Sequence, residues 1–393
     1  MLNQDIVREA TRLTRSGRLT EATALLQRML RGEHAPNPIP TPGRPVSATG
    51  TEPPTIDAKA NEAETRARPR TRRTPSNLPK NFPGFGPGGS LRRAPPSMAD
   101  MVPDGTSFVE GTYKNAAGSR AYRLFTPSGY HGQAIPLVIM LHGCTQSPED
   151  FAAGTRMNFI AEERTCFVAY PAQRAEANQA KCWNWFRPSD QQRGGGEPSL
   201  IAGITRQIMR DHAVDPKRVY IAGLSAGAAA AAVMGSTYGD LYAAIGIHSG
   251  LACGAAADVP SALMAMKQGG RSETMPADGP PIPTIVFHGD RDTTVHSKNG
   301  GQVVQQSIGR TRTKAKVHRG RVPGGHAYTR TVHTDASGHA ILEHWEIHGA
   351  GHAWSGGSPA GSYTDPDGPD ATREMLRFFL EHSLPHSASH VTR

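Results

Sequence analysis

The chain has 393 residues, of which 37% are apolar and 20% charged, a balance that fits one large or two ordinary globular domains. It has no run of about 18 apolar residues, which excludes a membrane-spanning helix. Its N-terminus lacks the apolar stretch of a secretory signal, so we expect a cytoplasmic location, with secretion as the alternative.

The net charge of +9 belongs mostly to residues 1–105, which hold 16 Lys or Arg against 10 Asp or Glu. The remaining residues hold 27 against 24. A basic segment of this kind binds polyanions only non-specifically, so we expect no specific nucleic-acid partner.

Residues 3–31 predict two short amphipathic helices, because Ile6, Ala10 and Leu13 share one helical face and a similar stripe follows the break near Gly17. The resulting hairpin, residues 1–32, is too small to bury a core by itself. We expect it to dock on the rest of the protein, pair with a second chain, or bind an apolar surface.

Residues 33–105 predict a disordered linker. Of the 32 prolines, 15 lie between Pro36 and Pro103, and such a stretch buries too little apolar surface to offset its ordering entropy. Residues 386–393 form a second predicted tail, at the C-terminus.

From residue 106 to 385, apolar runs alternate with helical segments. This pattern predicts an α/β domain, a three-layer sandwich whose mostly parallel sheet is covered by helices on both faces. An antiparallel pair comes first. The predicted parallel strands are 136–143, 166–171, 218–223, 243–250 and 283–289. Helices are expected near 150–164, 199–213, 226–238 and 297–309, with late strands at 326–334 and 340–348 and a last helix at 370–382.

A candidate nucleophile, Ser225, lies in the sequence Gly223-Leu224-Ser225-Ala226-Gly227. The string G-x-S-x-G arises easily by chance, but here it follows a predicted strand and precedes an Ala-rich helix. Such a turn needs small neighbours and lifts the serine hydroxyl off the end of the sheet.

A nucleophilic serine needs a histidine base and an acid that orients it, and both should follow it in the chain. Asp290 and Asp292 both follow the strand at 283–289, and we favour Asp292 because it lies farther from the strand end. Among the histidines, His352 is favoured because it lies in a glycine-flanked loop after a late strand, with His348 as the alternative.

An oxyanion hole needs two backbone N–H donors. The residue after the nucleophile, Ala226, should supply one. The turn at 141–146 should supply the other, and Cys144 is the candidate there.

Three tryptophans border this predicted triad. Trp183 and Trp185 lie in the segment 181–187, and Trp354 follows His352 closely. Exposed aromatic side chains beside a catalytic serine suit an apolar or polymeric substrate, so we expect these three to bind substrate. The alternative is that they plug the core.

The four cysteines show no CxxC or zinc spacing, and we expect neither a metal nor a cofactor. Without a visible signal, reduced thiols are the default. A disulfide between Cys144 and Cys182 would brace the cleft, but it would require an oxidising compartment.

Taken together, these motifs resemble the poly(3-hydroxybutyrate) depolymerase-type esterases, a branch of the α/β-hydrolases that is similar to feruloyl and acetylxylan esterases. The segments that carry the resemblance are LHGCTQ at 141–146, CWNWF at 182–186, VDPKRVYIAGLSAG at 214–227, FHGDRDTTV at 287–295 and GAGHAWSGG at 349–357.

The resemblance implies a serine esterase that uses Ser225, Asp292 and His352 to hydrolyse a polyhydroxyalkanoate-type polyester or its oligomers. Two alternatives remain: a feruloyl or acetylxylan-type carbohydrate esterase, and a binding protein that attaches to a polyester granule or polyanion through residues 1–105.

Overall fold

The computed structural model describes residues 95–270, 282–309 and 311–385. The predicted helical hairpin, the predicted linker as far as residue 94 and the predicted tail 386–393 lie outside these residues.

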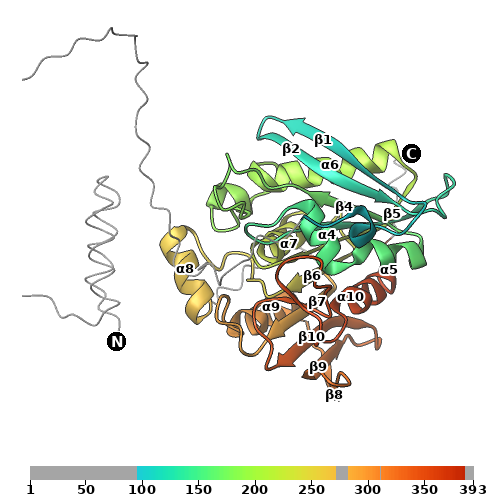
Figure 1. Ribbon diagram of the computed structural model, residues 1–393. Coiled ribbons are helices and arrows are strands. Elements are labelled where there is room, and N and C mark those ends of the chain that lie inside the picture. The colour runs from blue at the N-terminus through green and yellow to red at the C-terminus, as the bar shows by residue number, and fades with distance from the viewer. Residues whose placement is uncertain (1–94, 271–281, 310, 386–393) are drawn as a thin grey trace, which may run out of the picture. The chain divides into compact units, whose positions relative to one another are not determined.

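A ten-stranded sheet forms the centre of the described domain, in the order β1-β2-β4-β3-β5-β6-β7-β10-β9-β8 (Figure 1). Six neighbouring strands of this sheet, in the spatial order β4-β3-β5-β6-β7-β10, run parallel. The pair β1 and β2 at one edge and the pair β9 and β8 at the other are antiparallel. The strands are β1 (Ser107–Asn115), β2 (Gly118–Thr126), β3 (Ile135–Leu141), β4 (Phe167–Pro171), β5 (Val214–Leu224), β6 (Ala244–His248), β7 (Thr284–Gly289), β8 (Lys314–Arg321), β9 (Ala327–Thr334) and β10 (Ala340–His348). Two short strands, β11 (Trp354–Ser355) and β12 (Thr364–Asp365), pair separately.

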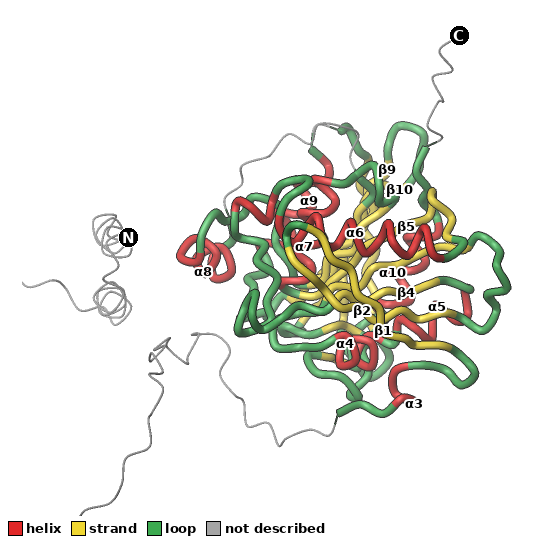
Figure 2. The backbone as a smooth tube through the Cα atoms, turned by 90° about the horizontal axis from the view of Figure 1, so that it is seen from above, coloured by secondary structure: helices red, strands yellow, loops and turns green. Residues whose placement is uncertain are grey.

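Helices cover both faces of the sheet, which confirms the predicted three-layer α/β class (Figures 1 and 2). They are α3 (Met98–Met101), α4 (Pro148–Thr155), α5 (Met157–Arg164), α6 (Gly196–Asp211), α7 (Ala226–Thr237), α8 (Val259–Gln268), α9 (Lys298–Ile308) and α10 (Ala371–Leu380), with a short 3₁₀ helix, η1 (Pro188–Gln191).

The alternation of side chains along β3 shows why two cores form. Leu137 and Ile139 pack into one apolar cluster with α6, α7, α8 and α9, whereas Val138 and Met140 pack into a second with α4, α5 and α10. Successive side chains of a strand point to opposite faces, so a strand that is apolar throughout must be covered on both sides.

The predicted linker boundary at residue 105 is wrong. Residues 98–101 form α3, Met101 and Val102 are buried in the second core, and the Asn158 side chain donates a 2.9 Å hydrogen bond to the Met101 carbonyl. These apolar side chains anchor the segment to the domain, which therefore includes residues well before 106.

Among the longer elements of the described residues, β8 and α8 have no counterpart among the predicted ones. β8 is an exposed, Lys- and Arg-rich edge strand without the apolar alternation that marks a half-buried strand. α8 follows a loop that begins after β6, and it lies beside the candidate site. Within the described ranges, no helix is both long and apolar enough to cross a membrane.

Candidate active site

Ser225 occupies the sharp turn that joins β5 to α7. Its backbone angles are φ 57° and ψ −119°, a conformation that side-chain-bearing residues rarely adopt. A Cβ atom on Gly223 would come within 2.4 Å of the Gly227 backbone, and one on Gly227 within 2.1 Å of the Leu141 carbonyl oxygen. The glycines of the motif are therefore required by packing.

The Asp292 carboxylate pairs with the His352 ring, as predicted. Asp292 Oδ2 lies 2.6 Å from His352 Nδ1, and Oδ1 accepts hydrogen bonds from the backbone N–H groups of Thr294 and Val295 at 2.9 and 2.8 Å. Because a carboxylate only accepts, Nδ1 carries the proton and Nε2 remains free as a base.

A second histidine, His288 at the end of β7, also contacts Asp292. Its Nε2 lies 3.5 Å from Asp292 Oδ2 and 2.8 Å from the Val295 carbonyl oxygen. Burial by itself would raise the pKa of the Asp292 carboxyl, but the hydrogen bonds from His288 and His352 outweigh it and hold that pKa well below its usual range. The acid is therefore ionised at neutral pH.

The two alternative residues pair with each other instead. His348 Nδ1 lies 3.1 Å from Asp290 Oδ2, and both side chains are substantially exposed. Asp290 also accepts a hydrogen bond from the Gly349 backbone at 2.7 Å. This pair fixes the end of β10.

His248, at the end of β6, lies between the serine and the histidine loop. Its carbonyl oxygen accepts the Ser225 N–H at 2.9 Å, and its ring Nε2 accepts the Ser355 N–H at 3.0 Å. Burial is the main cause that lowers the pKa of the His248 ring to about 3, and the electrostatic influence of the neighbouring His288 and His352 rings acts in the same direction. The ring is therefore neutral and can accept this hydrogen bond.

In the part of the chain that the structure describes, no hydrogen bond joins the Ser225 hydroxyl to the His352 ring. The fold nevertheless brings the candidate residues to one edge of the sheet, because β5, β6, β7 and β10 are successive neighbours. Ser225 follows β5, Asp292 follows β7 and His352 follows β10. Ligand sites of parallel sheets lie at this edge.

The loop after β3 lies against Ser225. A Cβ atom on Gly143 would be 3.7 Å from the Ser225 Cβ atom, and the Gln146 side chain holds the loop by accepting the Gly143 N–H at 2.9 Å. Cys144 and Ala226, the predicted oxyanion residues, line the same pocket as Ser225. Ala226 is the first residue of α7, where backbone N–H groups have no partner within the helix.

Cys144 and Cys182 form a disulfide, so the expectation of four reduced thiols is wrong for these two. The residues are 38 positions apart in the sequence, but the fold brings their Cα atoms to 4.2 Å, and the Thr145 N–H donates to the Ala180 carbonyl beside them. Cys166 and Cys253 are free and buried.

The expectation that Trp183 and Trp354 bind substrate is wrong, because both rings are core. Trp183 is fully buried and its Nε1 donates to the His142 carbonyl at 3.1 Å. Trp354 is 1% exposed, stacks on the His248 ring and donates to Thr372 Oγ1. Both rings therefore pack in the core and are not part of the pocket lining beside Ser225.

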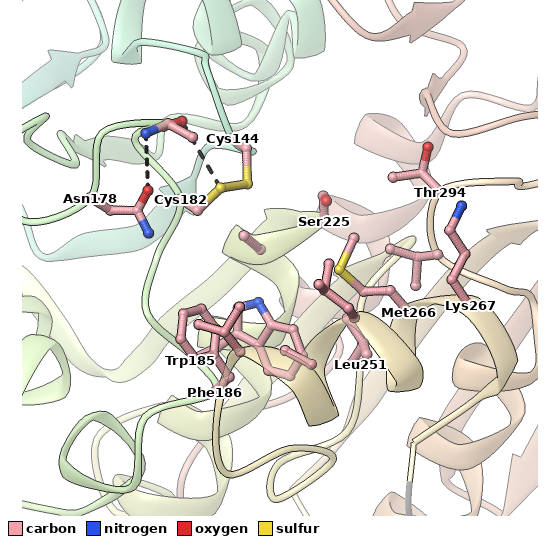
Figure 3. A pocket seen from close by; sticks show the side chains of 16 residues that line it. Cys144, Asn178, Cys182, Trp185, Phe186, Ser225, Leu251, Met266, Lys267 and Thr294 are labelled. Carbon is pink, nitrogen blue, oxygen red and sulfur yellow. Dashed lines mark hydrogen bonds between the residues drawn. A yellow bond between two sulfur atoms is a disulfide. The ribbon is translucent and has the colours of Figure 1, made fainter. Parts of the chain in front are cut away.

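Trp185 does line the pocket beside Ser225 (Figure 3). It is only 6% exposed, so it contributes an edge to the pocket wall and not an open platform. The wall is otherwise mostly apolar, with Phe186, Leu251 and the facing side of α8 opposite the disulfide. The described residues contain no group of three or more His, Cys, Asp or Glu side chains suited to a metal ion.

Sequence reasoning missed His248 and His288, and it named the Cys144–Cys182 disulfide only as the alternative to reduced thiols. The two histidines end predicted strands, where a histidine is easily taken for an ordinary core residue. Only their neighbours in the folded sheet reveal what they contact.

Comparison with known proteins gives consistent matches. The chain is 32% identical to poly(3-hydroxyalkanoate) depolymerase C of Paucimonas lemoignei over 58% of its length, and 27% identical to a probable acetylxylan esterase A of Aspergillus clavatus over 44%. It spans only 56% and 61% of those two relatives. An acetyl xylan esterase structure from Aspergillus awamori shares the fold, with a TM-score of 0.55 and 18% identity over 70% of this chain and 99% of that one.

A family model named Esterase PHB depolymerase matches residues 120–317, which are 198 of the 393 residues. This stretch contains the Ser225 turn, the loop at 141–146, the disulfide and Asp292. The chain therefore belongs to the Esterase PHB depolymerase family.

Proposed function

We propose that this protein is a serine carboxylic ester hydrolase in which Ser225 is the nucleophile, His352 the base and Asp292 the acid that orients the base. The observation that carries the proposal is the strained Ser225 turn at the head of α7, beside a loop whose histidine is already paired with an ionised aspartate. The family assignment supports the same chemistry.

In the proposed reaction, Ser225 Oγ attacks the ester carbonyl carbon while His352 Nε2 takes the hydroxyl proton. The tetrahedral oxyanion is stabilised by the backbone N–H groups of Cys144 and Ala226. His352 then protonates the leaving alcohol, and an acyl-enzyme remains. Water, deprotonated by the same ring, attacks this ester and releases the acid and the free serine.

The proposed substrate is a polyhydroxyalkanoate-type polyester or an oligomer of it. The pocket beside Ser225 is lined mainly by apolar side chains, which suits the aliphatic chain of such an ester better than a sugar. The relative from Paucimonas lemoignei, named for poly(3-hydroxyalkanoate) depolymerisation, supports this substrate class. Attachment to a granule through residues 1–105 remains a separate proposal, because residues 1–94 lie outside the described structure.

An acetylated or feruloylated carbohydrate is the second candidate substrate. The acetylxylan esterase relatives favour it. A carbohydrate esterase would need polar groups for the sugar near Ser225, and Asn178 and Thr294 are the uncharged polar side chains available in the pocket lining.

The test is turnover of p-nitrophenyl butyrate, 3-hydroxybutyrate oligomers, amorphous polymer, methyl ferulate and acetylated xylan, each with the wild-type protein and Ser225→Ala. We expect hydrolysis of the butyrate esters that Ser225→Ala reduces by several orders of magnitude. A folded Ser225→Ala protein with near-normal activity would rule out the mechanism. If the wild-type protein hydrolysed only acetylated xylan or methyl ferulate, the substrate would be a carbohydrate ester and not a polyester.

A further inference from the structure

One face of α8 forms a wall of the pocket that contains Ser225. Val259, Ala262, Leu263 and Met266 line the pocket, and their spacing places them on one side of the helix. Because this face is apolar and directed at the pocket, α8 contributes to the choice of substrate.

The same face ends in a positive charge. Lys267 also lines the pocket and is exposed to solvent. Its ammonium group donates a 3.2 Å hydrogen bond to the Thr293 carbonyl, in the loop that carries the acid Asp292 (Figure 3 shows Lys267 beside Thr294). The lysine side chain therefore bridges α8 and the catalytic loop at the edge of the pocket.

Lys267 is the one charged residue in the pocket lining, all of which belongs to the described part of the chain. Among the described residues, no carboxylate forms an ion pair with it, and its recorded partner is a neutral carbonyl. An ammonium group has three donors, so this one keeps capacity for an anionic acceptor.

We propose that the pocket selects esters whose alcohol part ends in a free carboxylate, with the aliphatic portion of that part against α8 and the carboxylate at Lys267. This inference rests on the proposed function and deepens it. An oligomer of a hydroxyalkanoate has this composition: apolar repeating units, internal ester bonds and one acidic end. The reaction that supplies such a substrate is chain scission of a longer polyester, because each hydrolysed bond creates a new carboxylate end.

The experiment compares kcat/KM for a 3-hydroxybutyrate trimer with a free carboxylate and for the same trimer capped as a primary amide, at pH 8 and low salt. The full-length protein is used, and the disappearance of each trimer is quantified by chromatography, because hydrolysis next to the cap releases the amide and not 3-hydroxybutyrate. An exposed charge pair contributes up to about 1 kcal/mol, so we expect wild type to favour the acid about fivefold. The ratio should fall as salt is added.

Lys267→Met should bring this ratio close to one, and Lys267→Arg should preserve it. Lys298→Met is the matched control: Lys298 is an exposed lysine at the start of α9 that does not line the pocket, and its loss changes the net charge equally. Because the ratio is taken within one variant, a general loss of activity does not affect it.

A wild-type ratio near one would overturn the inference, as would a ratio that Lys267→Met leaves unchanged; Lys267 would then serve only to complement the C-terminal end of α8. Turnover of p-nitrophenyl butyrate without turnover of either trimer would also overturn it. Failure to hydrolyse any ester would instead reject the proposed function.

Discussion

The backbone N–H of Ser225 donates a 2.9 Å hydrogen bond to the carbonyl of His248, while the His248 ring accepts the N–H of Ser355, three residues after His352. One buried residue thus contacts both the Ser225 turn and the loop that carries His352, the proposed base. The ring is held between Phe287 and Trp354, with centroid separations of 5.7 and 4.9 Å.

Replacing His248 with Phe tests this bridge. The aromatic packing is retained, but the Ser355 N–H loses its acceptor, which costs about 1–3 kcal/mol of stability for a buried donor. We expect kcat on p-nitrophenyl butyrate to fall at least tenfold with a smaller change in KM, because the base loop is displaced. His339→Phe, on an exposed turn, is the control. Unchanged kcat in a stably folded His248→Phe protein would show that the bridge is dispensable.

Asp292→Asn should reduce kcat by about four orders of magnitude, because the amide cannot hold the His352 ring in the tautomer that leaves Nε2 free. Asp290→Asn is the matched control, since that carboxylate pairs with His348 at a different position. It should change kcat by less than about threefold, within the small range of surface ion pairs. Rates measured on p-nitrophenyl butyrate distinguish the two aspartates, and equal losses would contradict the assignment.

His142, in the loop after β3, should make the stability of the protein sensitive to acid. Its burial lowers the pKa of the ring to about 4, and in its neutral form Nδ1 donates to the Gly143 carbonyl while Nε2 accepts the Gln173 N–H. The unfolded chain binds this proton near pH 6.5, so the unfolding free energy should fall as pH drops from about 6.5 to 4. Urea unfolding of wild type and His142→Gln, repeated across this pH window, gives the unfolding free energy of each as a function of pH. This free energy should fall less steeply with decreasing pH in the variant. Equal slopes in the two proteins would refute the prediction.

The disulfide predicts that two of the four cysteines are free. Thiol titration of the denatured, unreduced protein should find two thiols, those of Cys166 and Cys253. Closing a loop of this length stabilises the folded state by about 4 kcal/mol in the chain-entropy description. Reduction should lower both the melting temperature and kcat, since Cys144 lies in the loop that we propose supplies an oxyanion donor. Four free thiols would exclude the bridge, whereas two would also favour a protein that functions in an oxidising compartment.

The sequence was informative where a motif and its local structure coincide. The sharp turn at Ser225 could be predicted because the glycines of the motif permit the close packing that this turn requires. The position of Asp292 in the site could be predicted because it follows a buried strand, at the edge of the sheet where ligand sites form. The role of His248 could not be predicted, and the Cys144–Cys182 bridge could be named as a possibility but not decided, since both depend on contacts between distant segments. Whether a tryptophan in a loop, such as Trp183, is buried or lines a pocket depends on how the loop folds, and the residue type alone does not determine this.

The final prediction contrasts Trp185 with Trp354. Trp185 forms part of the pocket wall, so Trp185→Ala should reduce kcat/KM for 3-hydroxybutyrate trimers more than for p-nitrophenyl acetate, because the acetate is too small to use the outer wall. Trp354 is buried between Phe151 and the His248 ring, so Trp354→Ala should leave a cavity. The cost should be about 3–5 kcal/mol, and the rates on both substrates should fall together.

Urea unfolding and the two rate constants, measured on both variants, separate these outcomes. A pocket residue changes the ratio of the two rates with little loss of stability, whereas a core residue changes stability and leaves the ratio near the wild-type value. If Trp185→Ala instead behaves like Trp354→Ala, its ring supports the fold and does not contact the substrate, and the apolar wall that selects the aliphatic chain is then supplied by α8.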